Sequence, residues 1–202
     1  MKNRSYANRG QAFEEFLRFS NDRYAYKKLG RIEKLPTEFI PLRNAAGKVC
    51  SVKVERKSKV DFIGRYKRYP IAIEAKTTNE DSIRFDRIEP HQAEYMDGFT
   101  EEPGTIGLVV VSFSLKRFFV IPWAFWSVAY EYRVRRNDRT TPVTVSAFGQ
   151  TWTIPKKFSV RLDELNPSWE IPEYDPIYGI HYLKDAEKYI TTKPTKITEH
   201  GL

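Results

Sequence analysis

Three residues near the middle of the chain have the types and spacing that phosphodiester hydrolysis requires. Residues 71–76 are predicted to form a β-strand, and because successive side chains of a strand point to opposite faces, Glu74 and Lys76 share one face. Asp61 lies 13 positions before Glu74, and a turn over residues 64–70 would bring the two carboxylates side by side. Adjacent carboxylates repel each other unless a proton or an oxygen-liganded divalent cation neutralises them. Lys76 beside that cation would hold the attacking water or offset charge on the phosphoryl group.

The surroundings of this motif bear on two interpretations. The simpler one is a cross-strand salt bridge between Lys76 and Asp61 on a solvated face, which so short a pattern often reflects. Residues 48–68, however, contain eight Lys or Arg against Glu55 and Asp61, a local net charge of +6. A basic rim binds backbone phosphates while embedded acids hold a catalytic ion, so this context favours a phosphodiester substrate. The basic residues are Lys48, Lys53, Arg56, Lys57, Lys59, Arg65, Lys67 and Arg68.

The composition agrees with a nucleic-acid-binding protein and excludes other classes. The chain has 34 Lys plus Arg against 26 Asp plus Glu, a net charge of +8 that attracts polyanions. Its one cysteine, Cys50, excludes a disulfide framework and a thiolate zinc finger. Residues 1–10 are polar and basic, unlike a secretory signal, and the longest apolar stretch, residues 106–113, is too short to span a membrane. We therefore expect a soluble, cytoplasmic protein.

The hydrophobic periodicity predicts the elements that would position these side chains. Apolar residues at helical spacing, Phe16 among them, predict a helix over residues 10–28, with Gly30 just past its end. Later elements are a helix from Pro90, strands over 106–114 and 117–121, a helix over 122–136, a hairpin over 143–154 and a terminal helix over 182–190. This order predicts an α/β protein with a mixed layer structure. We expect a flexible basic arm at residues 1–9, one domain over 10–190 and a tail over 191–202.

Further short motifs, read in chain order, give a more specific resemblance. They are Asn8-Arg9-Gly10, Glu14, Leu35-Pro36-Thr37, Val60-Asp61-Phe62 with Gly64, Ile73-Glu74-Ala75-Lys76, His91-Gln92, Ile154-Pro155-Lys156-Lys157 and Ile180-His181-Tyr182-Leu183. An Asp on one strand and Glu-x-Lys on the next resembles the restriction-endonuclease-like superfamily. Over roughly residues 8–190 the whole set resembles the RecU family of Holliday-junction resolvases.

The resemblance implies a homodimer that depends on Mg²⁺ or Mn²⁺ and cuts two strands of a four-way junction. It also implies a restriction-endonuclease-like mixed central sheet flanked by helices. Asp61 and Glu74 would be metal ligands, and Lys76 would orient the water. Gln92 would lie in or just outside the metal shell, and Glu14 would assist the site from the first helix.

The same resemblance implies two elements that reach the junction. Arg9 would belong to a junction-contacting arm. A β stalk would project from the core over about residues 37–58, although an ordinary long β-hairpin is the alternative. The stalk would carry Arg43, Lys48, Lys53, Arg56 and Lys57.

Three features depart from the family's pattern. The stalk segment is shorter, which would limit how far it enters the junction. Lys59 stands where RecU proteins tend to have a metal-contacting threonine, and a cation there would oppose metal binding unless its side chain turns to the DNA. Residues 130–153 resemble an insertion. These departures would allow a preference for flaps or branched replication intermediates, as in a phage-encoded relative.

The sequence therefore predicts a metal-dependent endonuclease acting on branched DNA, with the Holliday junction as the expected substrate. Symmetric cutting of opposite strands requires two sites related by a two-fold axis, hence the expected homodimer. Residues 118–126 would supply its interface, but core burial explains this apolar segment equally well. Two alternatives stay open: a sequence-specific nuclease of the same superfamily, and a non-catalytic basic DNA-binding module in which the acids are structural.

Overall fold

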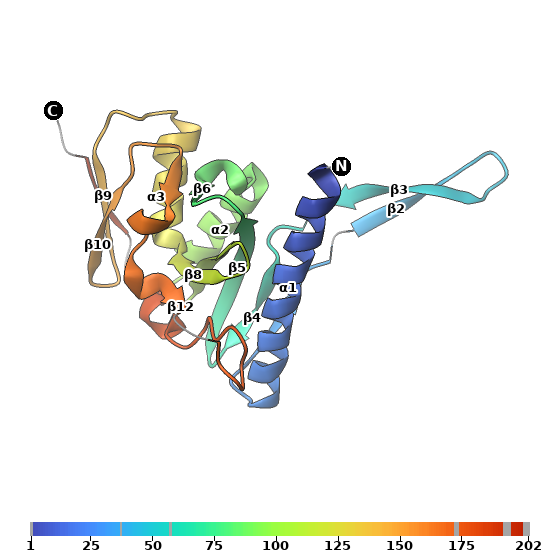
Figure 1. Ribbon diagram of the computed structural model, residues 1–202, viewed down its shortest axis with the longest axis horizontal. Helices are drawn as coiled ribbons and strands as arrows, with labels where there is room; N and C mark the ends of the chain where they lie inside the picture. The colour runs from blue at the N-terminus through green and yellow to red at the C-terminus, as the bar shows by residue number, and fades with distance from the viewer. Residues whose placement is uncertain (1, 37, 57, 172–173, 192–194, 200–202) are drawn as a thin grey trace.

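The computed structural model has a six-stranded sheet at its centre, helices on both faces of the sheet and one long hairpin standing out from the body (Figure 1). The structure describes residues 2–36, 38–56, 58–171, 174–191 and 195–199, with the backbone alone at 2–9, 38–41 and 52–56. This arrangement confirms the predicted fold class, a mixed central sheet flanked by helices with a projecting β element.

The central sheet consists of strands from both halves of the chain. They are β1 (Gly30–Lys34), β4 (Phe62–Tyr66), β5 (Tyr69–Thr78), β7 (Ile106–Phe113), β8 (Arg117–Pro122) and β12 (Glu170–Ile171), in the order β1-β4-β5-β7-β8-β12. Strands β5 and β7 are parallel, whereas the other neighbouring pairs are antiparallel. All eight residues of β7 are buried, as expected of a central strand covered on both faces.

The hairpin of β4 and β5 is tighter than the sequence predicts. Only Lys67 and Arg68 join the two strands, instead of a seven-residue turn, and Lys67 adopts a left-handed φ of 52°. The short turn extends both strands and pairs Phe62 with Ile73. One step further in this register, Asp61 lies opposite Glu74.

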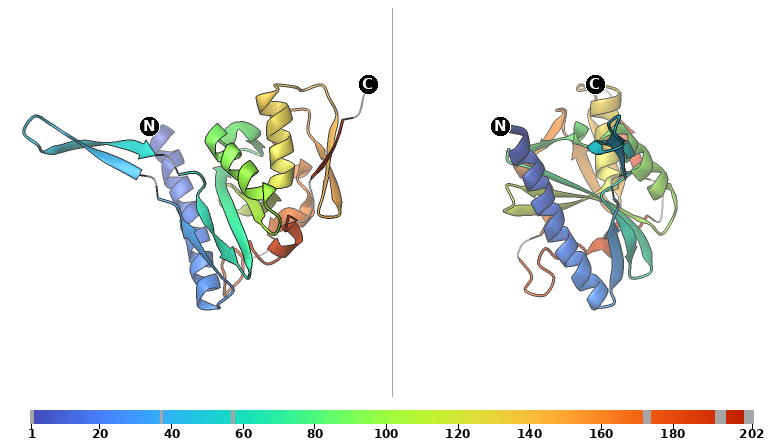
Figure 2. Two further views of the ribbon diagram at one scale, coloured as in Figure 1. Left: turned by 180° about the vertical axis from the view of Figure 1, so that it is seen from behind. Right: turned by 90° about the vertical axis from the view of Figure 1, so that its right-hand side faces the viewer.

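Helix α1 (Lys2–Tyr26) lies along one face of the sheet, against β1 and β5 (Figures 1 and 2). Its buried residues include Phe13, Leu17 and Tyr24, but Phe16, expected in the same stripe, is 45% exposed. The prediction of a flexible arm over residues 1–9 is wrong for the residues that the structure describes, because the backbone of residues 2–9 is helical and continues α1. A packed helix extends at little cost once its nucleus has formed. Gly30 is not the helix cap but begins β1.

Helices α2 (Pro90–Glu101) and α3 (Trp123–Tyr130) cover the opposite face of the sheet, and a π-helical turn (Glu131–Arg135) continues α3 (Figure 2). Residues 118–126, offered as a dimer interface, are largely core. Phe119, Ile121 and Trp126 are at most 1% exposed. Burial in the core therefore explains why this segment is apolar.

The projecting hairpin consists of β2 (Glu38–Arg43) and β3 (Val49–Arg56), which pair only with each other (Figure 1). Its turn is closed by Asn44, whose Oδ1 accepts the backbone N–H groups of Ala46 and Lys48 at 3.1 and 3.0 Å. Gly47 takes a φ of 76°, which glycine adopts without strain. The hairpin lies at the position predicted for the stalk.

Shorter elements complete the fold. They are β6 (Ser82–Arg84), β9 (Val143–Ala147), β10 (Gln150–Ile154), β11 (Ser159–Arg161), β13 (Lys196–Glu199) and the 3₁₀ turns at Phe85–Arg87, Leu162–Glu164, Pro167–Trp169 and Ala186–Tyr189. The predicted hairpin over 143–154 is present as β9 and β10, whereas part of the expected tail pairs with β9 as strand β13. No helix of the described residues is long and apolar enough to cross a membrane.

The terminal helix expected over 182–190 is wrong except for one 3₁₀ turn. Side chains hold this segment against α1 instead: the Tyr24 hydroxyl accepts the N–H of Leu183 at 3.2 Å and lies 3.0 Å from His181 Nδ1. Leu183 and Tyr189 point into the core. These tertiary contacts override a helical spacing that is only nine residues long.

Candidate active site

A cavity of about 190 Å³ lies near the carboxyl end of β5, bordered by α1 on one side and the first turn of α2 on the other. It contains the sequence-predicted acids and the lysine together. Its lining residues are Gly10, Phe13, Glu14, Asp61, Glu74, Ala75, Lys76, Thr77, Arg87 and Gln92. Five of the predicted site residues thus meet although they come from four separate segments.

Asp61 lies where the pairing of β4 with β5 ends. Its Oδ2 accepts the backbone N–H of Ala75 at 2.8 Å, in place of a backbone carbonyl of the ladder. This bond holds the carboxylate beside β5, opposite Glu74. The alternative prediction, a salt bridge between Lys76 and Asp61, is wrong: the Lys76 ammonium pairs with Glu74 instead.

The carboxylate of Glu74 is fully buried, and only one of its two oxygens has hydrogen-bond partners among the described residues. Its Oε1 accepts from Lys76 Nζ at 2.6 Å and from Gln92 Nε2 at 2.7 Å. Its Oε2 is buried with no hydrogen-bond partner among the described residues. Burial raises the pKa of Glu74 to about 8; the Asp61 charge raises it further, and Lys76 opposes the shift.

Gln92 belongs to the first turn of α2 and connects that turn to Glu74. Its Oε1 accepts the N–H of Glu89 at 2.9 Å in a capping box and also lies 3.3 Å from Lys76 Nζ. This oxygen therefore already has two protein contacts, and whether Gln92 lies in or just outside a metal shell stays a prediction. Its contact with Glu74 explains why it is buried.

Glu14 reaches the cavity from α1 and pairs with Lys34 of β1. Glu14 is a predicted site residue, whereas Lys34 is not, since a lysine 20 positions away carries no local signal. Arg87 also lines the cavity and was not predicted. It lies in a short turn between β6 and α2, where no periodicity marks it.

The predicted DNA-contacting residues do not all gather here. Arg65, Lys67 and Arg68 lie toward the turn of the β4–β5 hairpin, at the opposite end of these strands from Asp61 and Glu74. The Lys67 side chain pairs with Glu187. Lys59 does not line the cavity; its ammonium lies 5.5 Å from the centre of the Tyr95 ring.

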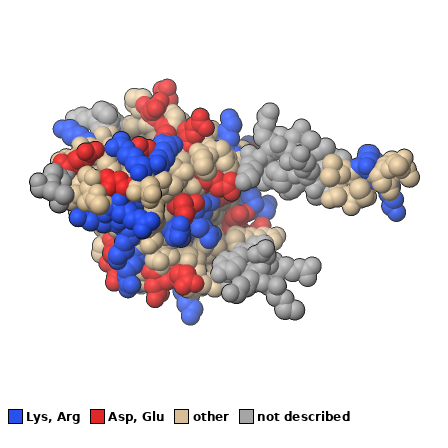
Figure 3. All heavy atoms as spheres, turned by 90° about the horizontal axis from the view of Figure 1, so that it is seen from above, with Lys and Arg blue, Asp and Glu red and all other residues tan. Residues whose placement is uncertain are grey.

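The remaining predicted contacts are on or near the stalk and the N-terminus. Arg43 and Lys48 are exposed at the turn of the hairpin. The side chains of Arg9, Lys53 and Arg56, and all of Lys57, lie outside the described part of the chain. Figure 3, which looks down on the molecule, shows Lys and Arg grouped on the body with acids among them, and further basic side chains near the stalk tip.

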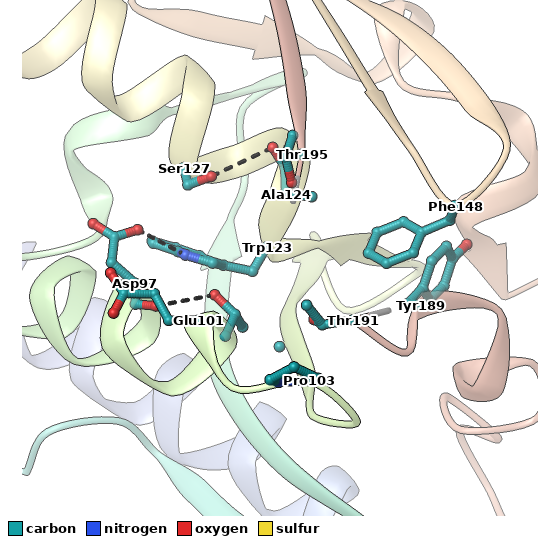
Figure 4. Close-up of a pocket in the computed structure, with 12 residues that line it drawn as sticks. Asp97, Glu101, Pro103, Trp123, Ala124, Ser127, Phe148, Tyr189, Thr191 and Thr195 are labelled. Atoms are coloured by element: carbon teal, nitrogen blue, oxygen red, sulfur yellow. Dashed lines mark hydrogen bonds between the residues drawn. The ribbon is translucent and has the colours of Figure 1, made fainter. Parts of the chain in front are cut away.

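A larger cavity, about 520 Å³, lies between α2, α3 and the C-terminal segment (Figure 4). Its carboxylate Asp97 already accepts from Trp123 Nε1 at 2.9 Å and from Arg135 at 3.3 Å. Glu101 also lines this cavity but is exposed, and within the described residues neither acid has a buried oxygen without a partner, as Glu74 does. We therefore assign the chemistry to the smaller cavity.

The donors of the smaller cavity fit a hard divalent cation. Glu74 Oε2 is a buried oxygen without a partner, and the neighbouring Asp61 carboxylate makes proton or metal binding favourable. No cluster of three or more His, Cys, Asp or Glu occurs within the described residues. Two carboxylates suffice for Mg²⁺, because this ion keeps several waters and takes further oxygens from substrate phosphates.

Comparisons with known proteins agree with this geometry. The model of the family RecU, described as Recombination protein U, matches residues 8–169. A relative from Streptococcus sanguinis (strain SK36), named Holliday junction resolvase RecU, is 29% identical over 147 residues, 69% of this chain and 72% of the relative. The protein of the same name from Streptococcus mutans serotype c is 30% identical over 164 residues, 72% of this chain and 81% of the relative.

One solved structure is also similar, the Holliday junction resolvase Hjc of Archaeoglobus fulgidus. It has a TM-score of 0.35 and 17% sequence identity, and the match covers 58% of this chain and 75% of that chain. The family model, in contrast, spans most of the chain and includes every residue of the smaller cavity. The chain therefore belongs to the RecU family.

Proposed function

We propose that this protein is a structure-specific endonuclease that resolves Holliday junctions by cutting two opposed strands. The observation that carries the proposal is the convergence of Asp61, Glu74 and Lys76 on one cavity. The names of the relatives support the four-way junction as the substrate. We also propose that residues 10–190 act as one nuclease domain.

In the proposed reaction, a water oxygen attacks the phosphorus in line with the bond to the 3′ oxygen. That bond breaks, the attacking water gives up a proton to solvent, and the departing 3′ oxygen takes one up, so that the products are a 5′-phosphate and a 3′-hydroxyl. The carboxylates of Asp61 and Glu74 would hold Mg²⁺ or Mn²⁺, which when bound neutralises phosphoryl charge and lowers the pKa of bound water. Lys76 positions the attacking water and offsets negative charge as it develops.

The neighbouring residues fix this constellation before substrate binds. Ala75 N–H orients Asp61, and Gln92 orients Glu74. Both holding groups belong to regular elements, a strand and a capped helix, so little reorganisation is needed during the reaction. Glu14 lies at the rim of the cavity, where its pairing with Lys34 fixes its position.

Two further parts of the proposal concern the assembly. Cutting opposed strands symmetrically requires a homodimer with two cavities related by a two-fold axis. The stalk would enter the centre of the junction and its basic side chains would contact phosphates there. A cytoplasmic location accords with a chromosomal substrate.

The test uses a labelled four-way junction assembled from synthetic oligonucleotides. Wild type and Lys76→Ala are incubated with it, with and without Mg²⁺, and the products are sized. We expect paired, symmetric nicks with the wild type in Mg²⁺ and none in EDTA or with Lys76→Ala. A linear duplex of the same sequence is the matched substrate control.

Each alternative has its own result. Cleavage of the linear duplex at a fixed sequence, with the junction cut no better, would indicate a sequence-specific nuclease. Junction binding without any cleavage in Mg²⁺ or Mn²⁺ would leave only a DNA-binding module.

A further inference from the structure

Arg87 is an exposed cation at the edge of the candidate active site, on a turn whose backbone the core holds in place. It ends the 3₁₀ turn Phe85–Arg87 and lies between two anchors, since Phe85 is 0% and Ile88 is 1% exposed. The Phe85 ring packs edge-on against Trp126, with ring centres 5.4 Å apart. The backbone from which Arg87 projects is therefore fixed by the core.

The guanidinium of Arg87 makes one hydrogen bond, to the carbonyl oxygen of Thr77 at 3.3 Å. This carbonyl follows Lys76 directly along β5. No carboxylate of the described residues pairs with Arg87, whereas Lys76 pairs with Glu74 and Lys34 with Glu14. Within the described residues, Arg87 is thus a lining cation of this cavity without an ion-pair contact, although the neighbouring Asp86, whose carboxylate is bonded to Arg84, acts on it electrostatically.

A neighbouring group in the same cavity is also unsatisfied. The hydroxyl of Thr77 is buried and has no hydrogen-bond partner within the described residues. A guanidinium has five N–H donors in a planar fork that matches the oxygens of a phosphate. The cavity therefore offers free donors beside the two acids.

We propose that Arg87 binds a backbone phosphate of the strand being cut and so sets where that strand lies over Asp61 and Glu74. This inference rests on the proposed function and adds a substrate-binding residue that the sequence motifs do not contain. Arg87 acts on the bound strand in the ground state, which distinguishes it from Lys76. Its loss weakens binding rather than abolishing the chemical step.

Arg84 provides a matched control from the same short segment. It is an exposed arginine three positions away, but its guanidinium is bonded to Asp86, with Nε 2.9 Å from Oδ1, and it does not line the cavity. The comparison of Arg87→Ala with Arg84→Ala therefore separates a general loss of one positive charge from the loss of a specific phosphate contact.

The experiment measures binding of a labelled four-way junction in EDTA at several salt concentrations, and cleavage in Mg²⁺. Arg87→Ala should weaken binding about tenfold and reduce the slope of log K against log salt by about 1, the change expected for one lost phosphate contact. Arg84→Ala should change the affinity less than about twofold and leave the slope at its wild-type value. Arg87→Lys should recover part of the affinity, because it keeps the charge but loses the fork.

Two results would overturn the inference. One is an Arg87→Ala variant with wild-type affinity and salt slope. The other is a variant whose kcat falls at unchanged affinity, since that would make Arg87 a transition-state residue. A wild type that binds the junction but does not cut it would contradict the proposed function alone, because the binding comparison between the two arginine variants still tests Arg87.

Discussion

The ammonium of Lys76 lies 2.6 Å from Glu74 Oε1, while the second oxygen of the same carboxylate is buried without a hydrogen bond from any described residue. A buried carboxylate that is compensated on one side only is costly to ionise. The structure retains this cost where the carboxylates of Asp61 and Glu74 meet. Ionisation of Glu74 thus favours binding of a cation to the free oxygen.

The first prediction concerns pH and the stability of the metal-free protein. Glu74 has a pKa of about 8 in the folded protein and an ordinary value of 4.5 in the unfolded chain. Between these values the unfolded chain loses the proton first, so rising pH favours unfolding. We expect the free energy of unfolding in EDTA to fall between about pH 5 and pH 8. The fall should be a few kcal/mol, because each unit of pKa difference corresponds to about 1.4 kcal/mol.

Urea unfolding at several pH values checks this expectation, with Glu74→Gln as the control. The amide does not titrate, so the variant should lose less stability over the same interval. Parallel curves for the two proteins would contradict the assigned pKa shift. Added Mg²⁺ should stabilise the wild type more at pH 8 than at pH 6, because the ionised acid binds the cation.

The second prediction separates two roles of Asp61, accepting the Ala75 N–H and carrying a negative charge. Asp61→Asn keeps an oxygen that can accept the Ala75 N–H but removes the negative charge. Cleavage should fall by a factor on the order of 10³, with junction affinity within about twofold of wild type. Asp61→Ala should lose activity equally and also lower the melting temperature, since the N–H loses its acceptor. Retained cleavage in Asp61→Asn would remove this acid from the site.

The third prediction tests the close approach of β1 to β4. A Cβ on Gly64 would lie 2.1 Å from the carbonyl oxygen of Arg31 and 2.6 Å from the Cα of Ile32, so Gly64→Ala must push β1 away. We expect a destabilisation of about 2 kcal/mol or more, measured by urea unfolding. Gly98→Ala is the control, because Gly98 lies on α2 with nothing within 4 Å of its added Cβ. That variant should be about 0.5–1 kcal/mol more stable.

The fourth prediction concerns the stalk. Arg43 and Lys48 are exposed at its turn, so their replacement by alanine leaves the core intact. The double variant should bind the four-way junction several-fold more weakly, with a salt slope smaller by up to about 2. Affinity for linear duplex should change little.

Lys188→Ala, at an exposed lysine paired with Asp185 far along the chain, is the control. An equal loss on both DNA forms would favour an ordinary β-hairpin.

Much of the site could be predicted from local sequence rules. Alternation along a strand places Glu74 and Lys76 on one face, and this depends only on the residues 71–76 themselves. The buried strand β7, the proline-initiated α2 and the hairpin of β9 and β10 likewise follow from local composition. In each case the signal lies within a segment of about a dozen residues.

The tertiary structure decided the rest, because the deciding contacts join residues far apart in the chain. Lys76 pairs with Glu74 rather than with Asp61, whose carboxylate accepts the Ala75 N–H instead. Gln92 accepts the N–H of Glu89 in a capping box while it donates to Glu74, and Arg87 reaches the cavity because buried neighbours fix its turn. Apart from the 3₁₀ turn Ala186–Tyr189, residues 182–190 are not helical, because the backbone N–H of Leu183 donates to the Tyr24 side chain of α1. Sequence periodicity reports which side of an element faces the core, but the partner that each polar side chain meets there depends on how the elements pack together.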